Sequence, residues 1–163
     1  MAFDAFLKID GIPGESTDDK YKDWIEVLTY GHEVEQPVSK TASSAGGATA
    51  ERVNFGIFSI TKHVDLTSPK LLEAVCTGRH IKEVTLVVCR AGGNKEKYLE
   101  IKMEQVLISR YSHLGGGGDF PGERIDFAPG TFRLTYTQQK RADGAPGGNV
   151  AMGWSLITNK TIA

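Results

Sequence analysis

The chain has little of several features that would assign it to common classes of protein. Two cysteines among 163 residues are too few for the disulfide framework of a small secreted domain. Six prolines, and glycines that follow no strict period, exclude a collagen-like chain. No apolar run approaches the roughly 18 residues of a membrane-spanning helix, and the first ten residues lack the pattern of a secretory signal peptide. We therefore expect a cytoplasmic protein that folds without disulfides.

The chain also lacks an excess of basic residues. It has 19 Lys and Arg against 20 Asp and Glu, which gives a net charge of −1. Free-standing domains that bind nucleic acid usually carry a basic excess, so we expect no nucleic-acid partner. The charge is unevenly distributed, with a net −5 over residues 1–60 and +4 over residues 61–163. One molecule can therefore present both an acidic and a basic surface.

Alternating apolar residues and glycine are what the chain has in quantity. Its length fits one domain, and 40% hydrophobic and 24% charged residues are typical of a globular fold. The 19 glycines, about 12% against a typical ~7%, indicate many turns. Apolar and polar residues alternate in eight or nine short stretches, which predicts an antiparallel sandwich or barrel. The stretches are 3–9, 24–30, 55–60, 84–88, 99–103, 106–108, 124–128, 132–137 and 152–158.

The apolar alternation shifts by one residue within the longest of these regions. Leu99, Ile101 and Met103 alternate with charged residues, and the apolar run 106–108 then falls on the other phase. An extra residue in one strand produces such a shift. We expect a bulge there, or a bend between two sheets.

One helix is expected from residue 68 to about residue 78. The sequence Thr-Ser-Pro at 67–69 offers a hydroxyl N-cap followed by proline at the first helical position. Gly78 lies where a left-handed residue ends a helix. Three apolar residues share a helical stripe and are expected to be buried: Leu71, Leu72 and Val75.

The stretch 31–53 differs from the rest of the chain. Within 39–50, every residue except Lys40 is Ser, Thr, Ala or Gly. Loops this long are uncommon in compact domains and are usually functional or disordered. Two interpretations are open at this point, an arm that docks on another subunit and a disordered insertion.

The sequence contains no convincing pattern of an active site, a cofactor site or a metal centre. His63 and Asp65 would share one face of a strand, but two ligands cannot close a metal site, so we expect a surface or capping role. Neither a G-x-S-x-G motif nor the spacing of a phosphate loop is present. We therefore expect no enzyme activity. The alternatives are a small β-barrel hydrolase and a monomeric β-barrel that binds carbohydrate or lipid.

Several segments, in their order along the chain, resemble the haemolysin co-regulated protein (Hcp) family, the tube protein of type VI secretion. The opening FLKIDGIPGESTDDKYKDWIEV at 6–27 is similar to the first strands of that family. The segment GGATAER at 46–52 follows a small-residue loop, as it does in the family. Residues 58–71 resemble the family segment FxxxKxxDxxSPxL, and LVVCRAG at 86–92 and YTQQ at 136–139 continue the match.

The resemblance implies a mainly β fold. Two antiparallel sheets would close as a β-barrel, with one short α-helix at the side and a long extended arm. It implies a single domain over residues 1–163, with the arm at about 31–53 and the helix at about 68–78. It implies a structural subunit of the type VI inner tube that is not an enzyme.

The implied partners are those of a tube. The chain would form a homohexamer, its rings would stack, and effector toxins would travel in the lumen. A spike protein would cap the tube and a contractile sheath would surround it, with no insertion into a membrane. The protein would reside in the bacterial cytoplasm before firing and be exported to the extracellular space or a target cell without a signal peptide.

The arm is expected to dock on a neighbouring subunit or on the next ring. Its acidic residues belong to the negatively charged part of the chain, and the remainder is positively charged, so a contact could join the two. The residues assigned to this interface are Glu33, Val34, Glu35, Pro37, Val38, Ser43, Gly46, Gly47, Glu51 and Arg52.

Overall fold

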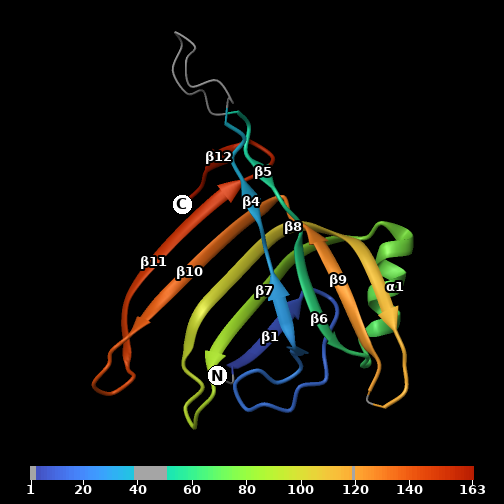
Figure 1. Ribbon diagram of the computed structural model, residues 1–163, viewed down its shortest axis with the longest axis horizontal. Coiled ribbons are helices and arrows are strands. Elements are labelled where there is room, and N and C mark those ends of the chain that lie inside the picture. The colour runs from blue at the N-terminus through green and yellow to red at the C-terminus, as the bar shows by residue number, and fades with distance from the viewer. Residues whose placement is uncertain (1–2, 39–50, 119) are drawn as a thin grey trace.

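The computed structural model describes residues 3–38, 51–118 and 120–163 (Figure 1). Within them the chain is mainly β, with one short helix, as expected. In chain order the elements are β1 (Phe3–Ile9), β2 (Ile25–Val27), β3 (Thr29–Gly31), β4 (Val34–Glu35), β5 (Asn54–Phe55), β6 (Phe58–His63), α1 (Ser68–Thr77), β7 (His80–Arg90), β8 (Lys97–Leu114), β9 (Gly122–Ala128), β10 (Thr131–Gln139), β11 (Pro146–Ser155) and β12 (Lys160–Thr161).

Ten of these strands form one antiparallel sheet that branches at β8. One branch runs in the order β12, β11, β10, β8, β7, β1 and β2, and the other leaves β8 through β9 to β6 and β3. At 18 residues, β8 is long enough to serve both branches. Its residues 99–104 pair with β10, and its residues 107–114 pair with β9.

The branches diverge at Gln105, which has a left-handed backbone with φ of 52°. The N–H of Gly130, between β9 and β10, donates to the carbonyl oxygens of both Glu104 and Gln105 at 3.0 Å. A side chain on Gly130 would bring its Cβ to 3.0 Å from the Cβ of Gln105, so this close approach favours glycine. The bend predicted from the apolar phase shift is confirmed.

The strand pairing does not close this sheet into a barrel, so that part of the expected fold is not confirmed. β2 ends one branch and β3 ends the other, and only Leu28 separates them along the chain. The N–H of Leu28 donates to the carbonyl oxygen of Thr61 on β6 at 2.8 Å. The free ends of the two branches are therefore joined by the chain itself and by this hydrogen bond.

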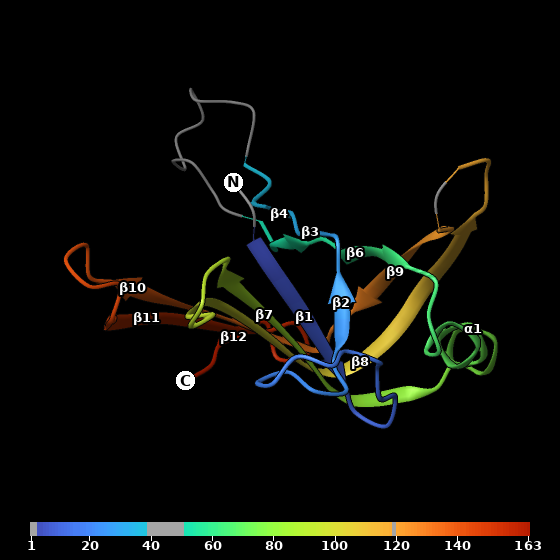
Figure 2. The same ribbon diagram turned by 90° about the horizontal axis from the view of Figure 1, so that it is seen from below.

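The two branches face each other across one apolar cluster (Figure 2). The first branch contributes Leu7 and Ile25, and the second contributes Phe58 and Ile125, all of them buried. Their partners in the cluster come from β7, β8, β10 and α1. Each fully buried side chain of this kind stabilises the fold by about 1.5–3 kcal/mol.

The C-terminal end of α1 is formed as predicted. Gly78 has a left-handed φ of 64°. Its N–H donates to the carbonyl of Val75 at 3.4 Å, and the N–H of Arg79 donates to the carbonyl of Ala74 at 3.1 Å. These two bonds make a Schellman motif, which satisfies carbonyl groups that the helix leaves unpaired.

The predicted hydroxyl cap is wrong, and the predicted buried stripe is wrong at Leu72. Thr67 precedes the helix but makes no side-chain cap; its hydroxyl donates to Asp65 instead. The buried stripe consists of Leu71 and Ala74, with Val75 partly buried, whereas Leu72 is 47% exposed. Successive residues point about 100° apart around a helix, so Leu71 and Leu72 cannot both face the centre of the same contact.

Candidate subunit interface

The described part of the predicted arm is a two-stranded ribbon. β4 pairs with β5, and Val34 lies opposite Phe55. Beyond this pair, the N–H of Glu51 donates to the carbonyl of Pro37 at 3.2 Å. The side-chain amide of Gln36 donates to the carbonyls of Pro37 and Glu51 at 3.1 and 2.6 Å. We call residues 32–38 and 51–56 the arm root.

The arm root projects from the sheet on the side where β12 lies, away from α1 (Figure 1). The guanidinium of Arg52 donates to the carbonyl of Leu156, in the turn between β11 and β12, at 3.5 Å. The predicted interface residues Glu33, Val34, Glu35, Val38, Glu51 and Arg52 are exposed, and Pro37 is half-buried. Ser43, Gly46 and Gly47 lie outside the described residues.

An aromatic cluster holds the arm root against the sheet. The ring of His32 stacks on Phe132 of β10, with 4.4 Å between ring centroids and 16° between planes. Phe55 packs edge-on against Phe132 at 5.2 Å and lies 4.8 Å from His32. Burial lowers the pKa of His32, and a hydrogen bond with the backbone of Gly56 opposes this shift. No local sequence pattern indicates this cluster, because its members lie far apart along the chain.

The outer edge of β11 is uncovered. β10 pairs with β11 from residue 146 to residue 155, but β12 pairs only with Trp154 and Ser155. Along residues 146–152, no other strand of the described chain lies on the outer side. Val150 on this stretch is 74% exposed. An exposed edge of this kind can accept a strand from another chain.

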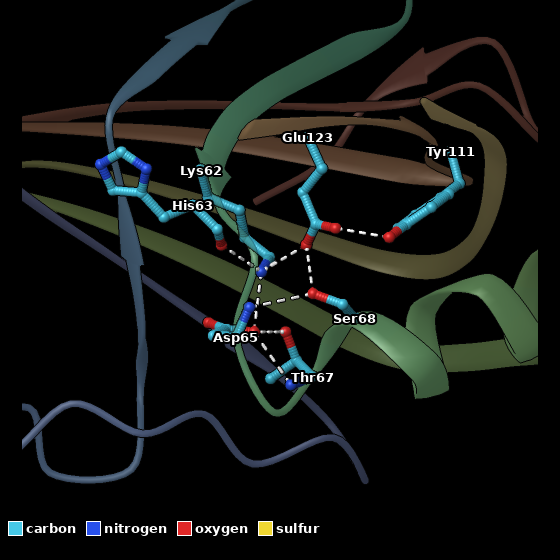
Figure 3. A network of polar contacts seen from close by, with 7 residues as sticks. All are labelled: Lys62, His63, Asp65, Thr67, Ser68, Tyr111 and Glu123. Atoms are coloured by element: carbon cyan, nitrogen blue, oxygen red, sulfur yellow. Dashed lines mark hydrogen bonds and ion pairs between the residues drawn. The ribbon is translucent and has the colours of Figure 1, made fainter. Parts of the chain in front are cut away.

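A compact group of titratable side chains lies beside the start of α1 (Figure 3). Lys62 of β6 is fully buried. Its Nζ lies 2.5 Å from Oε1 of Glu123 on β9 and 2.8 Å from Oδ1 of Asp65. It also donates to the carbonyl of His63 at 3.0 Å. The two carboxylates supply the compensation that a buried ammonium group needs.

The carboxylates of this group also bind the helix and a second strand. The hydroxyl of Ser68, the first residue of α1, donates to Glu123 at 2.8 Å. The hydroxyl of Tyr111 on β8 donates to Glu123 at 2.5 Å, and burial together with this carboxylate raises the pKa of Tyr111 to about 12. Asp65 accepts the backbone N–H of Thr67 at 2.9 Å. The group therefore connects α1 to β6, β8 and β9.

This ionic group is suited to anchoring the helix and not to turnover. Lys62 has no exposed surface and Glu123 is 3% exposed, so a substrate cannot reach either charge. Asp65 accepts the N–H of Thr67, the residue immediately before α1, and pairs with buried Lys62. His63 is exposed, and its imidazole points away from the ionic group (Figure 3).

Two further observations concern other kinds of site. In the part of the chain that the structure describes, no three His, Cys, Asp or Glu side chains converge to hold a metal ion. None of the helices there has the length and apolarity to cross a membrane.

The described residues form a branched sheet with an uncovered edge and a projecting ribbon, which are surfaces suited to contacts with other chains. Comparisons with known proteins identify the family. The family model described as type VI secretion system effector, Hcp, matches residues 6–138. Protein hcp1 of Pseudomonas aeruginosa is 36% identical over 162 residues, covering 98% of each chain. The chain therefore belongs to the Hcp family of the type VI secretion system, whose members are secreted tube proteins.

Solved structures show the same relationship. A structure of a type six secretion system protein has a TM-score of 0.92 and 35% identity, and covers 99% of this chain and 100% of the other. Hcp1 from Salmonella typhimurium has a TM-score of 0.83 and 30% identity over 99% of this chain and 100% of its own. A type VI secretion system effector from Yersinia pestis has a TM-score of 0.75 and 29% identity over 94% and 100%. The family resemblance seen in the sequence is confirmed.

Proposed function

We propose that this chain is the subunit of the type VI inner tube and forms hexameric rings that stack. The observation that carries the proposal is 36% identity to Protein hcp1 over 98% of both chains. In this tube, effector toxins travel in the lumen, a spike protein caps the tip and a contractile sheath surrounds the wall. The chain itself is a structural component without catalytic activity.

A ring of identical subunits requires two different surfaces that meet each other. We propose that the uncovered edge of β11 is one of them and that the arm docks on a neighbouring copy or on the next ring. Glu33, Glu35 and Glu51 give the arm root acidic side chains at its surface. The net charge of +4 over residues 61–163 offers them a partner of opposite sign.

We further propose that residues 1–163 form one domain whose sheet is completed as a barrel at Leu28. The hydrogen bond from its N–H to Thr61 supports this, because it joins the ends of the two branches. The protein would remain in the bacterial cytoplasm until the sheath contracts, and would leave the cell without a signal peptide.

A single substitution on β11 tests the ring. The carbonyl of Gly153 accepts the N–H of Ile162 on the β12 side. In an antiparallel strand, the N–H and C=O of one residue point to the same side, and those of the residue two positions away point to that side as well. Ala151 lies two residues before Gly153, so its N–H points to the uncovered edge. Ala151→Pro removes this donor without touching the pairing with β10, and Ala151→Val is the control that keeps it.

Native mass spectrometry then reports assembly. The unmodified chain of 17.7 kDa should give six copies, about 106 kDa. Ala151→Val should keep the hexamer, and Ala151→Pro should shift the population toward smaller species while far-UV circular dichroism stays unchanged. A monomer for the unmodified chain at micromolar concentration would contradict the ring and favour a monomeric binding protein. A full hexamer for Ala151→Pro would remove the β11 edge from the interface.

A further inference from the structure

His32 lies at the point where the chain leaves the sheet and enters the arm root. It follows β3 directly, and one residue, Glu33, separates it from β4. Its ring contacts Phe55 of β5 and Phe132 of β10, and its centroid is 6.4 Å from that of Phe58 on β6. One side chain thus joins both strands of the ribbon to the sheet.

The hydrogen bonding of His32 is that of a neutral imidazole. Its Nε2 is buried and has no hydrogen-bond partner among the described residues. Close by, Gly56 donates its N–H to the carbonyl of Glu33 at 2.9 Å, which ties the two sides of the arm root together. A Cβ on Gly56 would lie only 2.4 Å from that oxygen. A second ring proton on Nε2 would therefore have no acceptor among the described residues.

The side chains in ring contact with His32 carry no negative charge. The contacting rings of Phe55, Phe58 and Phe132 are uncharged. β5 has no titratable residue, and the charged end of β6 is held in the ionic group with Asp65 and Glu123. On β10, Arg133 is exposed and alternates with Phe132. A hollow of about 420 Å³ adjoins His32, and its titratable and charged lining residues are Tyr30, Glu33 and Arg124.

Of the two charged residues in this lining, Arg124 is already hydrogen-bonded to other side chains and Glu33 is exposed to solvent. Arg124 donates from Nε to Asp126 at 2.9 Å and from Nη2 to Ser59 at 3.1 Å. Glu33 is exposed at the start of the ribbon. Protonation of His32 would therefore place a positive charge in a partly buried aromatic cluster without a carboxylate partner; burial disfavours this state, and the hydrogen bond with the backbone of Gly56 offsets only part of the cost.

We propose that His32 is a pH-sensitive latch: the neutral ring holds the arm root against β10, and protonation in mildly acidic solution releases it. The sign follows from linkage. Because burial lowers the pKa of His32 when the arm root is docked, the released state binds more protons, and docking weakens as the pH falls below the ordinary histidine range. Release of the arm root would also weaken contacts between subunits in an acidic compartment. This consequence rests on the proposed function above.

Hydrogen exchange measured by mass spectrometry tests the latch on the full chain. Exchange at the ring carbon Cε1 reports the pKa of each of the four histidines, and amide exchange of peptides over 28–38 and 51–58 reports docking. Both are measured from about pH 7.5 to about pH 5.5, a range that spans the ordinary histidine pKa. His32→Phe keeps an aromatic ring that cannot titrate, and His113→Gln removes an exposed histidine as the matched control.

We expect His32 to titrate below the ordinary histidine range. Arm-root amide exchange, corrected for its intrinsic pH dependence, should become several-fold faster at the acidic end. The rise should persist in His113→Gln and disappear in His32→Phe. An ordinary pKa for His32 in the unmodified chain would overturn the latch, as would an undiminished acid response in His32→Phe. Native mass recorded on the same samples reports ring assembly separately, so failure of the ring and failure of the latch are distinguishable.

Discussion

Lys62 and Glu123 form a buried ion pair that joins β6 to β9. The ammonium group of Lys62 is removed from water and depends on Glu123 and Asp65 for compensation. Removal of one member of a buried ion pair leaves the other uncompensated, which typically costs about 3–5 kcal/mol. Lys62 and Asp65 lie in a segment that carries the family resemblance. The sequence does not indicate Glu123 as their partner, because Glu123 lies on a strand about sixty residues later.

The first prediction concerns this pair. Glu123→Gln should lower the free energy of unfolding by about 3–5 kcal/mol, because Lys62 stays buried with one carboxylate fewer. Glu100→Gln is the matched control: its salt bridge with Lys97 at 2.5 Å is partly exposed, and pairs of this kind contribute about 0–1 kcal/mol. Urea titration of both variants gives the comparison. Equal losses in the two variants would show that the buried group does not anchor the fold.

At the scale of the element, α1 is held by one side and by its two ends. Leu71 is fully buried, whereas Leu72 is about half exposed. Leu71→Ala should therefore cost about 2–5 kcal/mol, because it leaves a cavity in the core. Leu72→Ala should change stability by no more than about 0.5 kcal/mol, as surface substitutions usually do. Denaturant titration of the two variants side by side checks the orientation of the helix, and a larger loss for Leu72→Ala would reverse it.

At the scale of the whole molecule, the arm is expected to serve assembly more than folding. Residues 39–50 are almost entirely small or polar, so a short Gly-Ser linker in their place should take little from the core. Thermal unfolding of the isolated subunit should change little, and ring stacking and tube-dependent secretion should fall. Electron microscopy of assembled tubes and a secretion assay measure the two effects. Normal stacking and secretion in this variant would show that the arm is only a connecting loop.

Local patterns predicted much of this architecture. The bend was visible as a change of phase after Met103, and the C-terminal end of α1 was visible in Gly78, because bulges and left-handed caps depend on a few neighbouring residues. The apolar pattern predicted Leu72 as buried, because more than one apolar stripe fits the surface of a short helix. The position of β8 against α1 decides which of these stripes is covered. The candidate interface was predicted from the composition of the arm, and its anchoring by His32 and Phe132 was not.

By itself, the sequence determined the β-rich class, the single helix and the family, because these rest on alternation, capping residues and the order of motifs along the chain. The tertiary structure decided which distant residues meet. It alone brings Glu123 to Lys62, stacks Phe132 on His32 and leaves the edge of β11 uncovered. The physical reason is that burial and pairing between strands depend on how the chain crosses itself in space. No local pattern contains that information.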